Sequence, residues 1–446
     1  MNIKINKGLN VALLGEAKKE SSELSSETYA VKPKDFHGVV PKMEVKAGDE
    51  VKAGTALFHD KYDKSVKFTS PVSGEVAEVK RGDKRKILEV IILADKETQY
   101  VDFKVEDANN LDAEQVKAKL LASGAWSYIK KRPYDVIARP NEEPKAILIK
   151  GFDSSPLSAD YAYLVDGEQQ NLQAGIDAVS KLTKGKVHLS LHSKKDAGVL
   201  SQLSGVEKHT VSGPHPSGNA SVIMHRVDPI NKGEVVWVIN APDLAIIGKL
   251  FTQGKFDPTK KVAFAGPQVK NPRYFILRSG VQLKNLAAEF DADQTRLISG
   301  SVLTGSKVNT EAYIGHYDYL ISAVTEEADK EFFGWIAPGL NKFSASRSFL
   351  STWLSPNKPR DIDTHQHGEE RAFVVTGQYE KVFPLDVFPV QLLKSILVED
   401  IELMENLGIY EVAPEDFALC EVVCTSKINS QEIVRNGLDM MIKEMS

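Results

Sequence analysis

The chain has 446 residues, of which 42% are hydrophobic and 26% charged, and its formal net charge is -5. This length exceeds a single hydrophobic core and indicates several domains, while the composition excludes a disordered or fibrous protein. Lys and Arg are spread along the chain without a basic block, which argues against nucleic acid as a partner.

No stretch of the sequence predicts a membrane-spanning helix. The most apolar runs, 235–239 and 244–251, are much shorter than the roughly 20 residues that such a helix needs. The N-terminus lacks an apolar segment followed by a small-residue cleavage site, so no secretion signal is predicted. We therefore expect a cytoplasmic protein, which would be peripheral if it serves a membrane complex.

The first hundred residues predict an all-β module. Short alternating segments such as 39–45 and 67–70 lie between glycine turns. The segment 45–58 with its two glycines, followed by the turn 70–74 of sequence SPVSG, resembles the hammerhead of lipoyl and biotinyl carriers. The resemblance implies a barrel-sandwich fold for this part of the chain.

A carrier hammerhead needs one lysine at the tip of an exposed hairpin, where a prosthetic group is attached. Aligning Ser70 and Pro71 with the dipeptide that follows the lysine in lipoyl carriers places Asp63 at the carrier position. We therefore expect an unmodified β-module used for packing or docking. A lipoylated Lys61 or Lys64 is the alternative.

An α/β domain is predicted from about Asp112 onward. Helical spacing covers 113–122, and a compact apolar strand at 145–149 lies between Pro144 and Gly151. A further helix is expected at 168–182 and a strand at 186–190. Alternation of strands and helices indicates a partly parallel sheet.

The last part of the chain is predicted to be a small strand-rich unit followed by a largely helical region. Strand-like segments flank an amphipathic stretch at 281–290. Pro389 at a helix start and Gly408 at its end frame one amphipathic helix. The polar run 429–432 is a capping-box-like start to the last helix.

The order of these units carries a resemblance to a known family. Residues 261–273, together with 278–286 and 298–305, resemble the β-grasp module of soluble-ligand-binding proteins and respiratory subunits. Hammerhead, α/β domain and β-grasp in this order are similar to the C subunit of the Rnf complex and to the flavin-bearing NADH subunit of complex I. The segments 213–218 and 333–350 carry a closer likeness, and on this basis the chain is identified as a member of the A-subunit family of the bacterial Na+-translocating NADH:quinone reductase.

The resemblance implies a multidomain fold of α/β and β type with four parts. The expected parts are a lipoyl/biotinyl-like hammerhead at 1–105, a Rossmann-like α/β domain at 106–258, a β-grasp domain of the SLBB type at 259–312 and a largely helical domain at 313–446.

The chain departs from its flavin-bearing relatives where they bind the flavin phosphate. In those relatives a glycine-rich loop follows a Ser-Gly dipeptide, and its bare backbone amides approach the phosphate. Here Ser123 and Gly124 lead into 125–133, where larger side chains replace the glycines. Lys130, Lys131 and Arg132 could attract an anion, but we expect this charge run to be a solvated face. No G-x-G-x-x-G motif follows a predicted strand, so NADH is not expected to bind.

Metal and cluster ligands are equally sparse. A four-iron cluster needs about four cysteines, and the chain has Cys420 and Cys424 alone. We expect two buried, inert thiols on a helix, and a cluster shared with a partner subunit is the alternative. His365 and His367 could offer imidazoles to a metal but are expected to be solvated. No Ser or Cys lies in a recognisable nucleophile elbow.

The resemblance implies a peripheral subunit on the cytoplasmic side of the bacterial inner membrane. The complex would transfer electrons from NADH to ubiquinone or menaquinone and export Na+, with FMN, FAD, riboflavin and Fe–S centres in partner subunits. This chain itself is expected to carry no cofactor, no metal and no catalytic residue, and to be colourless when isolated. The alternatives are an Rnf-like electron-transfer flavin or Fe–S subunit or a swinging-arm carrier.

A surface that meets the membrane subunits is predicted in 332–350. This stretch combines aromatic and cationic side chains with Gly and Pro, a composition found at interface hot spots. Packing of these aromatics in the C-terminal domain's own core is the alternative. Binding of a quinone near this interface is a further alternative. The candidate residues are Phe332, Phe333, Trp335, Lys342, Phe343 and Arg347, with Gly213, Pro214 and His215 next.

Overall fold

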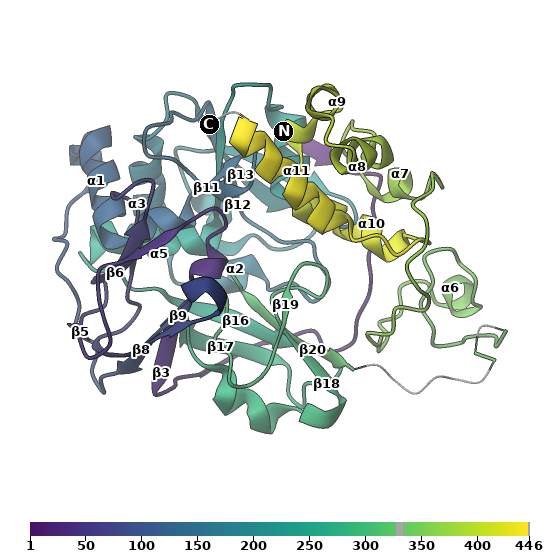
Figure 1. The fold of residues 1–446 in the computed structure, drawn as a ribbon, viewed down its shortest axis with the longest axis horizontal. Helices are drawn as coiled ribbons and strands as arrows, with labels where there is room; N and C mark the ends of the chain where they lie inside the picture. The colour runs from purple at the N-terminus through teal and green to yellow at the C-terminus, as the bar shows by residue number, and fades with distance from the viewer. Residues whose placement is uncertain (327–332, 335, 445–446) are drawn as a thin grey trace.

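The computed structural model describes residues 1–326, 333–334 and 336–444. Its strands form four sheets, and the C-terminal helices pack together along one side of the molecule (Figure 1). Among the described residues, none of the helices has the length and apolar character required to cross a membrane.

The N-terminal unit consists of two small facing sheets, as the short alternating segments predict. Phe36, Phe58 and Phe68 lie between them, with the Phe58 and Phe68 ring centroids 4.8 Å apart. Short 3-10 turns lie at Pro33–Asp35, Asp83–Arg85 and Ala108–Asn110. One sheet has the order β3-β9-β8-β5 (Thr28–Val31, Ile87–Ala94, Gly74–Arg81, Glu50–Val51), and the other β4-β6-β7 (Pro41–Met43, Ala56–Asp60, Lys67–Thr69).

Two strands from the start of the chain belong to other sheets. Strand β1 (Asn2–Lys4) pairs in parallel with β14 (Glu207–Ser212), and β2 (Lys18–Glu23) pairs in parallel with β17 (Arg273–Arg278). Each covers an edge strand whose backbone groups would otherwise lack partners. The first 23 residues therefore contribute to sheets that lie outside the predicted first domain.

The α/β unit contains a seven-stranded mixed sheet. Strand β12 (Ala146–Lys150) pairs in parallel with β13 (Lys186–His192) on one side and β15 (Val236–Asn240) on the other, which confirms the partly parallel sheet. Two short strands, β10 (Lys130–Arg132) and β11 (Val136–Ile137), complete the edge beyond β15 and run antiparallel.

Helices cover both faces of this sheet. The predicted helix at 113–122 is α1 (Ala113–Ser123), which begins with a capping box formed by Asp112 and Gln115 and ends at Gly124 with φ 81°. The predicted helix at 168–182 is α3 (Gln169–Ser180). The remaining segments are η4 (Ala125–Tyr128), α2 (Tyr161–Leu164), η5 (Gly198–Gln202), α4 (Ala220–Val227) and α5 (Ala241–Thr252).

Two glycines allow α3 and α5 to approach closely. A Cβ atom on Gly248 would lie 1.7 Å from the carbonyl oxygen of Asn171, and one on Gly175 would lie 2.6 Å from that of Leu244. The carbonyl oxygen belongs to a helix backbone, so it cannot turn away. The contact between the two helices depends on glycine at these positions.

We expect Gly248→Ala to destabilise the chain by roughly 1–3 kcal/mol, because overpacking against backbone outweighs alanine's better helix propensity. Thermal and urea denaturation would measure this loss. Gly437→Ala is the matched control, since its Cβ would meet side-chain atoms of Ile396 at 2.8 Å and not a backbone carbonyl, and it should cost less. Equal stability of Gly248→Ala and wild type would contradict the packing argument.

The third unit is a six-stranded sheet with the order β19-β18-β20-β16-β17-β2. The predicted amphipathic stretch 281–290 forms a 3-10 helix, η6 (Leu283–Glu289), which buries Leu283 and Leu286. Strand β20 lies beyond the predicted boundary at 312 and pairs with β16 and β18. The other elements are β16 (Thr259–Ala265), β18 (Thr295–Ser299), β19 (Ser306–Val308), β20 (Leu320–Thr325) and η7 (Ala292–Gln294).

The C-terminal region is helical from Tyr379 onward. The single helix predicted between Pro389 and Gly408 is wrong, because the structure has α8 (Pro389–Leu397) and α9 (Ile401–Asn406). Glu399 has φ 57°, and the side chain of Asp400 accepts a hydrogen bond from the amide of Leu403, which starts a new helix. The other elements are α6 (Ser351–Leu354), α7 (Tyr379–Val382), η8 (Ile409–Glu411), η9 (Pro414–Phe417), α10 (Ala418–Val423) and α11 (Ser430–Glu444).

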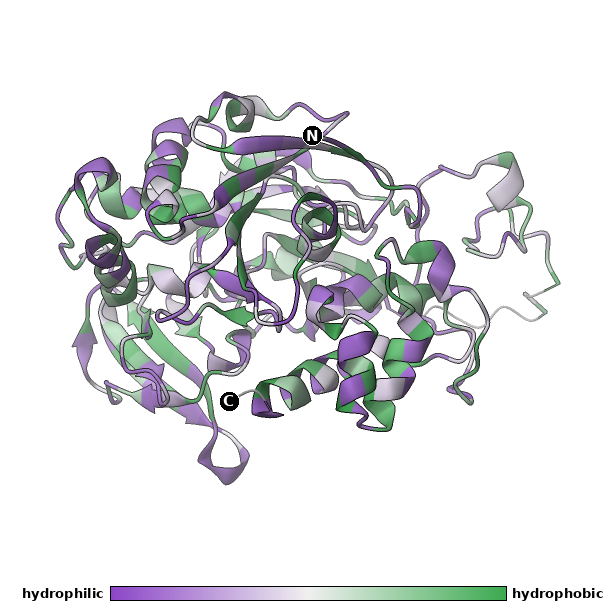
Figure 2. Cartoon of the chain, turned by 90° about the horizontal axis from the view of Figure 1, so that it is seen from above, coloured by the Kyte–Doolittle hydropathy of each residue, from purple (hydrophilic) through white to green (hydrophobic). Residues whose placement is uncertain are grey.

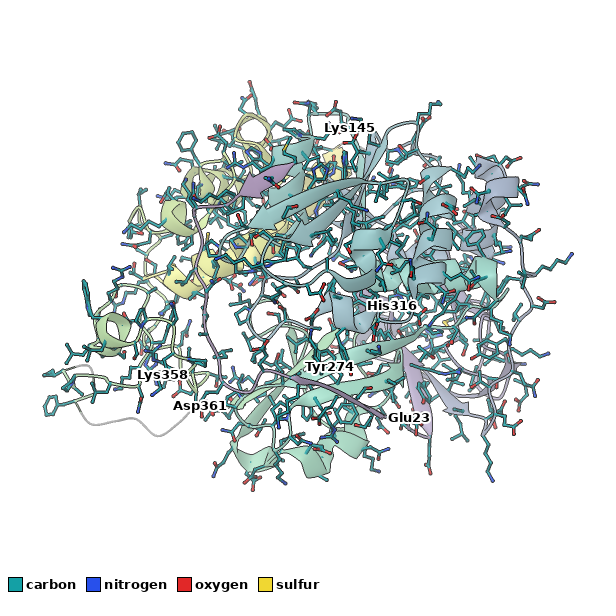
Figure 3. All side chains as sticks on the ribbon, turned by 180° about the vertical axis from the view of Figure 1, so that it is seen from behind. Glu23, Lys145, Tyr274, His316, Lys358 and Asp361 are labelled. Carbon is teal, nitrogen blue, oxygen red and sulfur yellow. The ribbon has the colours of Figure 1, made fainter. Side chains whose placement is uncertain are left out.

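A protruding segment, residues 333–334 and 336–361, extends from one end of the molecule (Figures 1 and 2). At its base, Thr325 Oγ1 at the end of β20 donates to Asp361 Oδ1 at 2.7 Å. Its base lies beside the N-terminal chain, where Lys358 and Asp361 are labelled (Figure 3). Arg360 anchors it there, because its backbone pairs with Ala12 and Leu14. The buried guanidinium of Arg360 donates to the carbonyl oxygens of Ser351 and Ser355 at 3.0 and 2.6 Å.

Candidate functional site

A polar cavity of about 220 Å³ opens at the carboxyl ends of β12 and β15. The strand order reverses at this point, since β13 lies on one side of β12 and β15 on the other. In open α/β sheets this is where ligands bind. The charged side chains that line it are Lys130, Arg132, Asp135, Lys150, Asp153, Asp243, Asp318 and Glu415, and the hydroxyl side chains are Tyr128, Ser155, Tyr161, Ser301, Thr304, Tyr317 and Tyr319.

The charge run 130–132 is not a solvated face, so that prediction is wrong. The side chains of Lys131 and Arg132 are 5% and 4% exposed. These residues form strand β10, which pairs with β15 inside the sheet. Lys131 Nζ lies 2.6 Å from Glu142 Oε1, which compensates its buried charge.

Arg132 is the centre of a buried charge network, called here the Arg132 network. Its guanidinium contacts Asp135 and lies 3.0 Å from Glu415 Oε1. Burial acts to raise the pKa of Asp135, but the charges of Arg132 and Lys130 hold it below its usual range. The nearby carboxyl of Asp416 has a raised pKa, mainly because it is buried and then because of Glu415. The cavity wall therefore joins the α/β unit to the C-terminal helices.

The loop that cradles phosphate in flavin-bearing relatives is here a short 3-10 helix, η4. Its side chains point inward, and Trp126 and Tyr128 are 0% and 1% exposed. Trp126 Nε1 donates to the carbonyl oxygen of Ala138 at 2.7 Å. Tyr128 lines the cavity, whose volume of about 220 Å³ lies below the roughly 300 Å³ of the smaller ligand pockets. The described residues do not fit a flavin at this position.

The predicted residues Gly213, Pro214 and His215 lie in the loop between β14 and α4. His215 is 4% exposed, so its side chain faces the interior and not a surface. Its Nδ1 lies 3.0 Å from Ser154 Oγ, and its amide donates to Asn10 Oδ1 at 2.9 Å. This loop therefore holds the N-terminal chain against the α/β unit.

Burial lowers the pKa of His215, although Asp153 and Glu415 oppose the shift. The unfolded chain takes up a proton at about pH 6.5, whereas the folded chain does so at a lower pH. The contribution of His215 to the free energy of unfolding is therefore constant above pH 6.5. Below pH 6.5 it decreases as the pH falls, by at most about 1.4 kcal/mol per pH unit. We expect His215→Asn to have a shallower decline in melting temperature between pH 7 and 5, and an unchanged slope would contradict this.

The predicted docking residues lie on the protruding segment, except Phe332 and Trp335, which fall outside the described residues. Lys342 Nζ donates to the carbonyl oxygen of Gly334 at 2.9 Å, and Phe343 is half-buried. Arg347 stacks on Trp353, with its Cζ 5.5 Å from the ring centroid. The exposed large apolar side chains of this segment are Phe333, Ile336, Leu340, Leu350, Trp353 and Leu354.

The other candidate ligands lie apart from the cavity. Cys420 and Cys424 are both free and buried, as predicted, and burial raises the pKa of Cys420. The amide of His367 donates to His365 Nδ1 at 2.8 Å, which engages one of its two ring nitrogens. Asp63 lies in the turn between β6 and β7, where its carboxylate accepts from the amide of Ser65 at 2.9 Å.

The charged cavity and one group of potential metal ligands could not be found from the sequence. The cavity side chains come from distant segments that meet only through strand order. Among the described residues, His188, Glu207 and His209 form a group whose ligand atoms all lie within 4.8 Å of one another. The alternation of polar residues in 207–209 was the available signal. The pairing of this segment with the strand predicted at 186–190 was not visible in the sequence.

Comparisons with known proteins match the full length of the chain. Three family models match, described as the NqrA N-terminal barrel-sandwich hybrid domain (3–95), the NqrA second alpha/beta domain (111–256) and the NQRA C-terminal domain (261–310). They confirm the barrel-sandwich and α/β units. Specific fold names beyond these descriptions stay predictions.

Two curated relatives are each named as the A subunit of a Na(+)-translocating NADH-quinone reductase. The protein of Hahella chejuensis is 38% identical and covers 99% of this chain and 100% of its own length. The protein of Vibrio atlanticus is also 38% identical with the same coverage. A solved NAD+-reducing [NiFe]-hydrogenase aligns with 12% identity and a TM-score of 0.39, over 78% of this chain and 67% of that one. That structural likeness is too weak to carry an argument.

Proposed function

Because this chain belongs to the A-subunit family of the Na(+)-translocating NADH-quinone reductases, we propose that it is the peripheral, cofactor-free subunit of such a complex. In this role it docks on the membrane subunits from the cytoplasmic side, near the step that reduces quinone. The complex as a whole transfers electrons from NADH to quinone and moves Na+. The chain contributes a docking surface and no redox centre.

The protruding segment is the observation that carries this proposal. It exposes Phe333, Trp353 and Leu354 at 58%, 64% and 74%, and it extends from one end of the molecule (Figure 1). Clusters of exposed apolar residues of this kind mark interaction sites on soluble proteins. Lys342 and Arg347 add positive charge beside them. We infer that a membrane subunit with an apolar and acidic surface covers this segment.

The replacement of the phosphate cradle supports the absence of a flavin. Trp126 and Tyr128 fill the interior where relatives have glycines, and the remaining cavity is small and densely charged. The two cysteines are too few for a protein-held iron–sulfur cluster. These features oppose the alternative of an Rnf-like electron-transfer subunit.

Affinity purification from native membranes tests the proposal. A tag at the C-terminus and extraction with a mild detergent should recover the chain together with integral membrane proteins and NADH:quinone reductase activity. The chain purified alone should be colourless and inactive. Stoichiometric flavin or iron in the isolated chain, or its recovery without membrane partners, would contradict the proposal.

A further inference from the structure

Three potential ligand side chains meet on one face of the seven-stranded sheet. His188 of β13 faces Glu207 of β14 in the parallel register, and His209 lies two residues further along β14. Residues two apart in a strand point to the same face, so all three side chains converge. Their ligand atoms lie within 4.8 Å of one another.

The two imidazoles are buried and close together. His188 Nδ1 lies 3.0 Å from His209 Nε2 and 3.7 Å from Glu207 Oε2. The two histidines are 3% and 4% exposed, whereas the Glu207 side chain is 48% exposed. The carboxylate therefore lies at the solvent-exposed side of the group, and the two imidazoles lie on its buried side.

Each of the two histidines presents one ring nitrogen to the other. His209 Nδ1 is buried and has no hydrogen-bond partner among the described residues. The ring nitrogen of His209 that faces His188 is Nε2, so Nε2 is the candidate ligand atom and Nδ1 is not. A hydrogen bond between two ring nitrogens requires one of them to accept, so that nitrogen carries a lone pair, which is what a metal binds.

We propose that His188 Nδ1, His209 Nε2 and a carboxylate oxygen of Glu207 bind one Zn²⁺ ion, with the fourth position open to water. Two histidines and one glutamate are an established zinc ligand set. Zinc–nitrogen bonds of about 2.0–2.1 Å in a tetrahedron place the nitrogens about 3.3 Å apart, a small widening of the observed separation. This proposal is independent of the proposed function and replaces the expectation of a metal-free chain.

Lys186 is the competitor for this site. Its Nζ lies 2.6 Å from Glu207 Oε1, and its side chain is 68% exposed. An exposed ion pair of this kind contributes little, so a divalent cation can displace the ammonium group from the carboxylate. A bound ion would join β13 and β14 beside β1, which pairs with Thr210.

Zinc titration of the untagged full-length chain, treated first with a chelator, tests the proposal by calorimetry. We expect one tight site, which His188→Asn and His209→Gln weaken by at least about 100-fold, since even indirect supports of a metal ligand cost 10–100-fold. These amides keep a polar atom near the replaced nitrogen and so preserve the fold. The exposed Glu207→Gln tests the third ligand without a change in the core.

Two controls separate this site from adventitious binding. His225→Gln removes a histidine 2.6 Å from Glu411, in a pair without a second imidazole, and should leave zinc affinity unchanged. His365→Gln with His367→Gln should also leave the tight site intact. Lys186→Met should tighten binding, because it removes the competing charge.

Stability gives a second readout. Zinc should raise the melting temperature of wild type but not of His209→Gln. Absence of a tight site in wild type, or its survival in both Glu207→Gln and His209→Gln, would overturn the proposal. Loss of the site in the His365→Gln, His367→Gln double variant would assign the zinc to the surface pair instead.

Discussion

The double variant Lys342→Glu, Arg347→Glu should lose association with the membrane complex, and membranes that carry it should lose quinone reduction. Both cations lie on the protruding segment among exposed apolar side chains. Reversal of charge at a docking surface places like charges against each other and leaves the acidic groups of the partner without a counter-charge. We therefore expect near-complete loss of the chain from purified complex, measured by subunit stoichiometry and by NADH-dependent quinone reduction.

The same variant should fold normally. Lys342 lies 5.6 Å from the Phe349 ring centroid, and Arg347 lies 5.5 Å from that of Trp353. Exposed contacts of this type contribute about 0.5–1 kcal/mol each, so the melting temperature of the isolated chain should fall by only a few degrees.

Lys61→Glu with Lys255→Glu is the matched control. These exposed lysines lie 5.8 and 5.0 Å from the ring centroids of Tyr62 and Tyr100, in another part of the molecule. This control should co-purify with the complex at the level of wild type. Normal co-purification and activity of the Lys342→Glu, Arg347→Glu variant would show that the docking surface lies elsewhere, for example near the exposed Phe388 and Val398.

Arg132→Met should destabilise the chain by about 3–5 kcal/mol, because it leaves the carboxylates of the Arg132 network without their cation. Arg132 is 3% exposed and contacts both Asp135 and Glu415. Urea denaturation followed by circular dichroism would measure the loss. The additional substitution Glu415→Gln should restore part of it, since it removes one stranded charge.

The control for this prediction is a solvent-exposed ion pair on the protein surface. Lys184 and Glu143 lie 2.9 Å apart, with side chains 88% and 53% exposed. Lys184→Met should leave stability almost unchanged. If Arg132→Met were as stable as Lys184→Met, the Arg132 network would have no structural role.

Local patterns in the sequence were sufficient for many elements. The helical spacing of 113–122 and the apolar periodicity of 168–182 locate α1 and α3 to within two residues. The same reasoning failed at Asp400, where a capping side chain interrupts a continuous apolar stripe. A pattern of apolar residues does not distinguish one helix from two that share a buried face.

The candidate sites depend on information that local patterns do not contain. Lys131 and Arg132 are buried because β10 joins β15 more than a hundred residues later in the chain. His188 and His209 converge because of the register between β13 and β14. Strand order and register follow from packing of the whole sheet, so neither site could be predicted from spacing.

The pairing of β1 with β14 and of β2 with β17 has a consequence for synthesis of the chain. Strand β1 finds its partner only after about 200 further residues have been synthesised, since Asn2 aligns with Thr210. The nascent N-terminal segment must therefore remain unpaired while the barrel sandwich behind it folds. Such long-range closure slows folding and exposes strand edges in the interval. Chaperone dependence of the nascent chain should thus persist until β14 and β17 have emerged, long after the first unit is complete.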